Sequence, residues 1–379
     1  MSQVFITKTA SFLPNFPIQN EQIEDHLGKI ANKPSRVRSI VLRQNGIKKR
    51  YYAMDTQQNI THTNAELAAK SINELSNSEK MVDAEMLLCA TSNADQLIPS
   101  HASMVHGLLK NKPMELYSFS GVCLTSIQAL KTGYMAVKSN EVSKAICSTS
   151  ELASAGLLSK NFETEYEYTT NVGTDPYMAF EKDFLRFMLS DGSAAILLEN
   201  EPKNKEDGIS LQIDWVDMDS YANELPTCMF YGAELRDDGE LKGWKEFTQE
   251  ELLNRSVLTL KQDIKTLKVY IIDYWIKHLK KVLEKNSCEP SEIKYVIPHV
   301  SSMFFYDKLN QAIKENNLNL TDDKWFTNLT TVGNVGSASI FIALDELVKS
   351  DKLMSGDKIL LLVPESGRFS YGTVHLTVT

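Results

Sequence analysis

One local pattern occurs twice in this chain, and the repetition strongly constrains its fold. In each copy an apolar run of strand length is followed by a polar loop with glycine, a stretch of helical apolar spacing and another apolar run. The copies cover residues 86–150 and 295–363, and they share pattern rather than sequence identity. The repetition predicts an α/β protein of two βαβ-type halves around a shared core, with chemistry at the strand ends.

The elements nearest the polar loops can be placed by their apolar spacing. We expect strands at Leu116–Ser120, Lys144–Ser150, Tyr295–Pro298, Phe326–Thr331 and Ile359–Val363, and helices at Leu124–Val137 and Ile340–Val348. The stretch Asn161–Phe187 has the composition of a surface insertion or of a flap over a cleft. The segment Thr248–Asn286 carries a helical apolar stripe, which indicates core packing.

Composition excludes several classes of function. The apolar fraction is 42%, the charged fraction is 23% and the net charge is −9 without a basic tract, so nucleic acid is not an expected partner. The apolar runs are far shorter than a membrane span, and residues 1–6 lack the features of a signal peptide. The five cysteines show no paired spacing, which argues against disulfides and zinc. Reduced thiols favour a cytoplasmic enzyme. No glycine-rich phosphate loop follows a strand, which argues against a nucleotide cofactor, so we expect neither a bound metal nor a bound cofactor.

Three polar residues follow β-rich runs and have complementary chemistry. Cys123 lies at the start of a helix, where the helix dipole is expected to lower the pKa of the thiol. His299 follows Val-Ile-Pro, and Asn334 lies within Val-Gly-Asn-Val-Gly. Together they could move acyl groups through a thioester. Taken singly, the cysteine could be a small buried apolar residue, the histidine a core residue and the asparagine a turn residue.

Seven short motifs occur in the order found in one enzyme family. They are Asn45-Gly-Ile-Lys-Lys-Arg50, Ile98-Pro-Ser100, Ser120-Gly-Val-Cys123, Leu189-Ser-Asp-Gly-Ser-Ala-Ala195, Val296-Ile-Pro-His299, Gly333-Asn334 and Ser366-Gly-Arg-Phe-Ser-Tyr-Gly372. With these motifs the chain resembles the β-ketoacyl-acyl-carrier-protein synthase III family over nearly its whole length. The resemblance implies a thiolase fold with a layered αβαβα core. The N-terminal half, residues 1–200, would carry the nucleophilic cysteine, and the C-terminal half, residues 201–379, the histidine and asparagine.

The resemblance also implies roles for individual residues. Cys123 would accept the acyl group, and His299 and Asn334 would hold the thioester carbonyl of the second substrate. The backbone N–H groups of Cys123 and Gly367 would form an oxyanion hole, while Asp191 would be structural. Substrates would be thioesters of coenzyme A or acyl-carrier protein. The protein would be a homodimer in which Ile98 closes the acyl pocket of the partner.

Departures from the family pattern indicate a specialised enzyme. The tryptophan that helps to hold coenzyme A in typical members is missing, because all four tryptophans lie in the second half of the chain. Phe304 stands where a basic residue is associated with carrier-protein docking. The block Ile40–Asp55 looks most like ketosynthases that make dialkylresorcinols and flexirubin-type precursors. The alternatives are a fatty-acid initiation synthase and a non-catalytic thiolase-fold partner subunit.

Overall fold

The central feature of the molecule is a long mixed sheet. The computed structural model describes residues 2–76, 83–172 and 183–379, and within them nine strands join in the order β13-β14-β15-β8-β1-β7-β6-β4-β5. Their bounds are β13 Ile293–Pro298, β14 Lys358–Glu365, β15 Ser370–Val378, β8 Leu211–Ser220, β1 Phe5–Phe12, β7 Gly192–Glu199, β6 Lys144–Glu151, β4 Met86–Thr91 and β5 Glu115–Ser120.

The sheet has a narrow junction in its middle. Strands β15 and β8 pair from Ser370 to Val378, whereas β1 and β8 pair only at Phe5 with Gln212 and at Ile6 with Leu211. Strands on one side of the junction come from residues 5–199, and those on the other side come from residues 211–378. The sheet therefore consists of two groups of strands that share little backbone hydrogen bonding.

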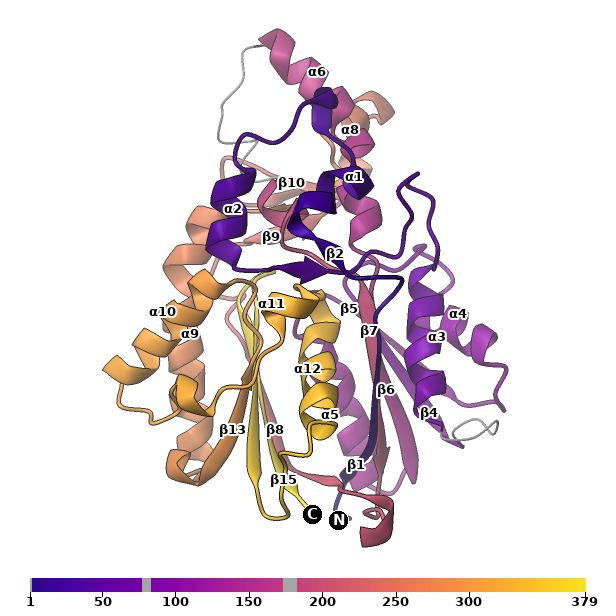
Figure 1. Ribbon diagram of the computed structural model, residues 1–379, viewed down its shortest axis with the longest axis vertical. Helices are drawn as coiled ribbons and strands as arrows, with labels where there is room; N and C mark the ends of the chain where they lie inside the picture. The colour runs from indigo at the N-terminus through magenta and orange to yellow at the C-terminus, as the bar shows by residue number, and fades with distance from the viewer. Residues whose placement is uncertain (1, 77–82, 173–182) are drawn as a thin grey trace.

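Helices complete a five-layered arrangement (Figure 1). Helices α5 and α12 lie between the two groups of strands, α3 and α4 cover one outer face, and α9 and α10 cover the other. The helices of these layers are α3 Asn64–Glu74, α4 His101–Leu109, α5 Thr125–Lys138, α9 Ile264–Lys285, α10 Met303–Glu315 and α12 Ser339–Val348. This arrangement confirms the predicted thiolase fold with its αβαβα core.

The spacing of apolar residues explains why α5 is central. Ile127, Leu130, Tyr134 and Val137 recur at three- and four-residue intervals and are buried. They pack in the same core cluster as strands from both sides of the junction. Truncating Leu130 to alanine would leave a cavity in that core and cost on the order of 2–5 kcal/mol of stability.

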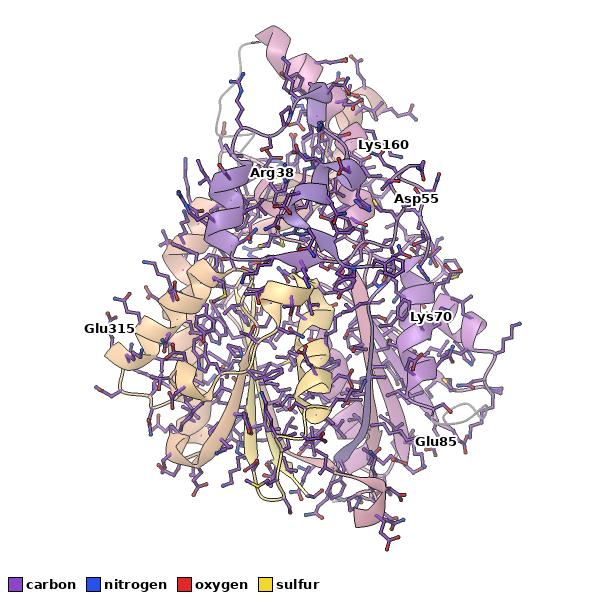
Figure 2. All side chains as sticks on the ribbon, viewed as in Figure 1. Arg38, Asp55, Lys70, Glu85, Lys160 and Glu315 are labelled. Atoms are coloured by element: carbon purple, nitrogen blue, oxygen red, sulfur yellow. The ribbon has the colours of Figure 1, made fainter. Side chains whose placement is uncertain are left out.

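A cap of short elements covers the end of the sheet that carries the polar loops (Figure 1). It contains α1 Ile23–Leu27, α2 Arg38–Asn45, α6 Glu163–Val172, α8 Gln249–Asn254, α11 Leu329–Val332, β2 Ile18–Gln19, β3 Lys49–Arg50, β9 Met229–Tyr231, β10 Ala233–Leu235, β11 Leu241–Gly243 and β12 Leu260–Gln262. Charged side chains such as Lys70, Glu85 and Glu315 lie on the outside of the molecule (Figure 2). Within the described part of the chain, no helix has the length and apolar character needed to cross a membrane.

Two predicted elements are wrong. The segment Phe326–Thr331 is not a strand; Trp325 makes a single bridge to Val296, and the chain then turns into the short helix α11. The segment Thr248–Asn286 is not one helix, because Leu260–Gln262 leaves the helical path to pair with β9. A new helix then starts at Asp263, whose carboxylate accepts the N–H groups of Lys265 and Thr266.

The predicted insertion at Asn161–Phe187 is only partly described. Its first part forms helix α6 in the cap, and residues 173–182 lie outside the described residues. At its end, Phe184, Leu185 and Phe187 are buried in a core cluster. This end of the segment therefore belongs to the core and is not a surface flap.

Candidate active site

The three predicted polar residues meet at one pocket. Cys123 lies between β5 and α5, His299 directly follows β13, and Asn334 lies between α11 and α12. All three side chains are buried, and all three line the same cavity of about 100 Å³. Residues from both copies of the sequence pattern therefore line one cavity.

The turn that carries Cys123 is held by several hydrogen bonds. The hydroxyl of Ser126 donates to the carbonyl of Cys123 at 2.9 Å, and that of Thr125 donates to the carbonyl of Val122 at 2.5 Å. On the opposite side, Glu365 Oε2 accepts the backbone N–H groups of Val122 and Leu124, both at 3.2 Å. The residues on either side of the cysteine are thus fixed by one carboxylate.

The predicted lowering of the Cys123 pKa is wrong. Burial raises the pKa of the thiol well above its ordinary value, and the negative charges of Glu365 and Glu151 raise it further. The sequence places the thiol near the start of a helix but does not show that two carboxylates fold against it. At rest the cysteine is therefore a protonated thiol.

His299 is a neutral imidazole. Burial lowers its pKa to about 4, because the charged form would lose its hydration. Its backbone N–H donates to the carbonyl of Leu362 in β14 at 2.8 Å, which fixes the loop at the strand end. A neutral imidazole can donate one ring N–H toward a ligand oxygen without adding a charge to the pocket.

Asn334 has an orientation set by its own loop. Its side-chain oxygen accepts the N–H of Gly336 at 3.0 Å, and its backbone bonds to Met188 and Ser190 across a bridge to the neighbouring segment. The amide NH₂ group has no acceptor among the described residues, so it is left to donate to a bound molecule. Asn334 thus shapes its own turn and also lines the pocket.

Sequence reasoning missed Glu151, which lies at the end of β6 and also lines the pocket. Its carboxylate accepts the backbone N–H and hydroxyl of Ser92 and those of Ser337, which joins loops from the two copies of the sequence pattern. Burial raises its pKa. A glutamate directly after a predicted buried strand was the available signal, since charged residues are rarely fully buried.

Two other predicted site residues lie outside the set that lines the pocket. Gly367 is next to it: an added Cβ would lie 3.4 Å from Val122 and 3.3 Å from Glu365. Ile98 is 85% exposed and does not reach the pocket of its own chain. A role for Ile98 therefore requires a second subunit.

Apolar side chains form most of the pocket wall. Much of it comes from the stretch between the two copies of the pattern, namely from Met229, Leu260, Leu267, Ile271, Ile272 and Trp275. Helix α9 presents the last four of these along one face. Such a wall suits an aliphatic chain, which gains about 0.8 kcal/mol for each buried methylene group.

Comparisons with known proteins show which proteins this chain is similar to. The family model for the C-terminal part of 3-oxoacyl-[acyl-carrier-protein] synthase III matches residues 283–377. The β-ketoacyl-[acyl-carrier-protein] synthase III of Clostridium perfringens strain SM101 is 24% identical over 351 residues, which cover 93% of this chain and 92% of that protein.

Solved structures show the same fold. A tetronic acid condensing enzyme superposes with a TM-score of 0.74 at 17% identity, over 99% of both chains. Xanthomonas campestris OleA with bound lauric acid and lauroyl-CoA superposes with a TM-score of 0.71 at 18% identity, also over 99% of both chains. The chain thus has the thiolase fold of these solved structures, and it is an acyltransferase similar to β-ketoacyl-[acyl-carrier-protein] synthase III.

Proposed function

We propose that this protein is a ketosynthase that joins two acyl thioesters by a Claisen-type condensation through an acyl group on Cys123. The convergence of Cys123, His299 and Asn334 on one pocket with an apolar wall carries this proposal. A thiol, a neutral imidazole and an amide NH₂ group supply the nucleophile and the two hydrogen-bond donors that such a reaction needs.

In the first step Cys123 takes the acyl group. Its sulfur, after loss of the thiol proton, attacks the thioester carbonyl, and the donor thiol leaves with a proton. The negative oxygen formed in between would accept hydrogen bonds from the backbone N–H groups of Cys123 and Gly367. Gly367 suits this role because it has no side chain between its backbone and the ligand.

In the second step another thioester binds with its carbonyl oxygen between His299 and Asn334. Loss of carbon dioxide, or transfer of an α-proton to the carboxylate of Glu151, which also lines the pocket, gives an enolate. His299 and Asn334 stabilise its charge by donating hydrogen bonds. The enolate carbon attacks the acyl carbonyl on Cys123, the carbon–carbon bond forms, and the carbon–sulfur bond breaks. The cysteine is then free for another cycle.

We propose that the product is a precursor of a dialkylresorcinol or a flexirubin-type pigment, formed from a β-ketoacyl thioester and a second acyl chain. The resemblance of Ile40–Asp55 to such ketosynthases supports this class. Substrate thioesters of acyl-carrier protein or coenzyme A are both compatible with the site. The competing candidate is fatty-acid initiation, because the curated relatives carry the synthase III name.

We also propose a homodimer, a cytoplasmic location and a division of the chain near residue 200. Strand β5 forms an edge of the sheet and contacts helix α4. Exposed apolar side chains occur on β5, on α4 and in the loop before α4, namely Tyr117, Met104, Leu108, Leu97 and Ile98. A strand edge with apolar neighbours is suited to pairing with a second copy.

All five cysteines are free, as is usual in a reducing compartment, which supports the proposed cytoplasmic location.

Intact-protein mass spectrometry tests the activity. After incubation with acyl thioesters of 2–16 carbons, the mass of one acyl group should be added at Cys123, and Cys123→Ala should take up none. His299→Ala and Asn334→Ala should still be acylated but lose roughly 10²–10³-fold in condensation rate. Rapid use of acetyl-coenzyme A with malonyl-carrier protein would favour initiation, and an unreactive Cys123 would favour the non-catalytic subunit.

A further inference from the structure

Glu365 contacts the turn that carries Cys123, and no role was predicted for it from the sequence. It ends β14 and is half-buried, and its Oε2 atom accepts the N–H groups of Val122 and Leu124, one on each side of Cys123. Its Oε1 atom lies toward Gly367, 3.3 Å from the place where a Cβ would stand there. One carboxylate thus lies against both the turn of Cys123 and the segment of Gly367. These are the two segments whose backbone N–H groups would hold the acyl carbonyl.

A negative charge at this place has two opposite effects. It is stabilised by the backbone N–H groups of Val122 and Leu124, which donate to the charged form, although burial outweighs them and raises the pKa of this carboxyl. It is unfavourable for a thiolate on Cys123 or for an oxyanion beside it, because like charges in a water-poor pocket repel.

We propose that Glu365 is a positioning residue that holds the turn carrying Cys123 and, through its charge, restrains the reactivity of that thiol. The proposal rests on the proposed function, since it takes Cys123 to be the nucleophile. Its first part follows from the two hydrogen bonds, and its second part from the location of the carboxylate. The raised pKa of the Cys123 thiol, for which Glu365 is the largest cause after burial, agrees with it.

The other ionisable groups around the site do not act on the turn of Cys123 as the charge of Glu365 does. Glu151 also opposes a negative sulfur, but its carboxylate is engaged by four donors on Ser92 and Ser337 rather than by the cysteine turn. His299 is neutral and lines the pocket. Arg368 is exposed, and its Nε donates to the carbonyl of Leu225 at 3.2 Å.

Two substitutions separate the parts of the proposal. In Glu365→Gln the amide oxygen can still accept both N–H groups, but the charge is gone. Iodoacetamide should therefore alkylate Cys123 roughly threefold or more faster at pH 7.5, with the pH profile displaced to lower pH. In Glu365→Ala the acceptor is also lost, so acylation by thioesters should fall about tenfold, whereas Glu365→Gln should restore it.

The experiment follows iodoacetamide labelling by peptide mass spectrometry, because Cys288 is also partly accessible. Glu315→Gln on α10, an exposed charge on the outer surface (Figure 2), is the control for loss of one negative charge. An unchanged labelling profile in Glu365→Gln, or normal acylation in Glu365→Ala, would overturn the proposal. If Glu365→Ala does not fold, the labelling profile of Glu365→Gln alone decides. Failure of every thioester to acylate the wild type would overturn the proposed function but leave the labelling test intact.

Discussion

Burial of His299 and Cys123 should make the rates of the two half-reactions depend differently on pH. Its imidazole gains a proton only near pH 4, because the pocket removes the water that would stabilise the charge. The Cys123 thiol has a pKa raised by the same burial. Acylation should therefore become faster as the pH rises, whereas the donor capacity of His299 stays constant over the neutral range.

We expect the second half-reaction to be nearly independent of pH between 8 and 5.5. The enzyme would first be acylated at high pH, and a single turnover with the second thioester would be followed by rapid quench at each pH. The same series on Glu365→Gln controls for titration of the neighbouring carboxylate. A rate that falls with a midpoint near 6.5 in both proteins would show that the imidazole titrates like that of free histidine.

At the scale of elements, helix α9 determines the shape of the pocket. A single residue, Asp263, separates it from strand β12, so the turn at Asp263 sets which face of the helix lines the pocket. Leu267, Ile271 and Trp275 lie on the face toward the pocket, whereas Val269 is 60% exposed on the other side. Chain-length preference should therefore depend on one face of this helix.

Leu267→Trp should shorten the preferred acyl chain, because the larger ring fills space that the chain would otherwise occupy. The measurement is the amount of acyl-enzyme formed with thioesters of increasing length. Val269→Trp on the same helix is the matched control and should leave the profile unchanged. Equal profiles for Leu267→Trp and the wild type would mean that the chain does not pass this part of the wall.

Apolar spacing in the sequence predicted most helices and strands around the site. The prediction failed where a short strand interrupts a stretch of helical spacing. Apolar spacing placed β5, α5, β13, α12 and β14 within a few residues of their bounds. It missed the pairing of β12 with β9, because three residues between two helical stretches carry no strand signal of their own. It also missed Glu151 and Glu365, because a carboxylate becomes part of the site only when distant loops fold onto it.

At the scale of the whole molecule, the exposure of the apolar residue Ile98 is not explained by the structure of a single chain. It is 85% exposed in the loop between β4 and α4, although the family resemblance implies a place at an acyl pocket. If two copies pair along β5, Ile98→Trp should shorten the acyl chains used by the partner and leave the dimer intact, as judged by sedimentation velocity.

Leu253→Trp, at a residue 65% exposed on α8, is the control for an added surface ring. A fully active monomer would contradict the shared pocket. So would an Ile98→Trp variant with an unchanged chain-length profile.

Among the described residues, only two pairs join β1 to β8, so the two groups of strands should be able to unfold locally at different rates. Backbone amides exchange with solvent when the hydrogen bonds that protect them break. The amide of Ile213, which bonds to Val4 beside the junction, should exchange faster than those of Val374 and Ile196 within the two groups of strands. Hydrogen–deuterium exchange should then resolve two cooperative units, and equal protection across the junction would argue for one.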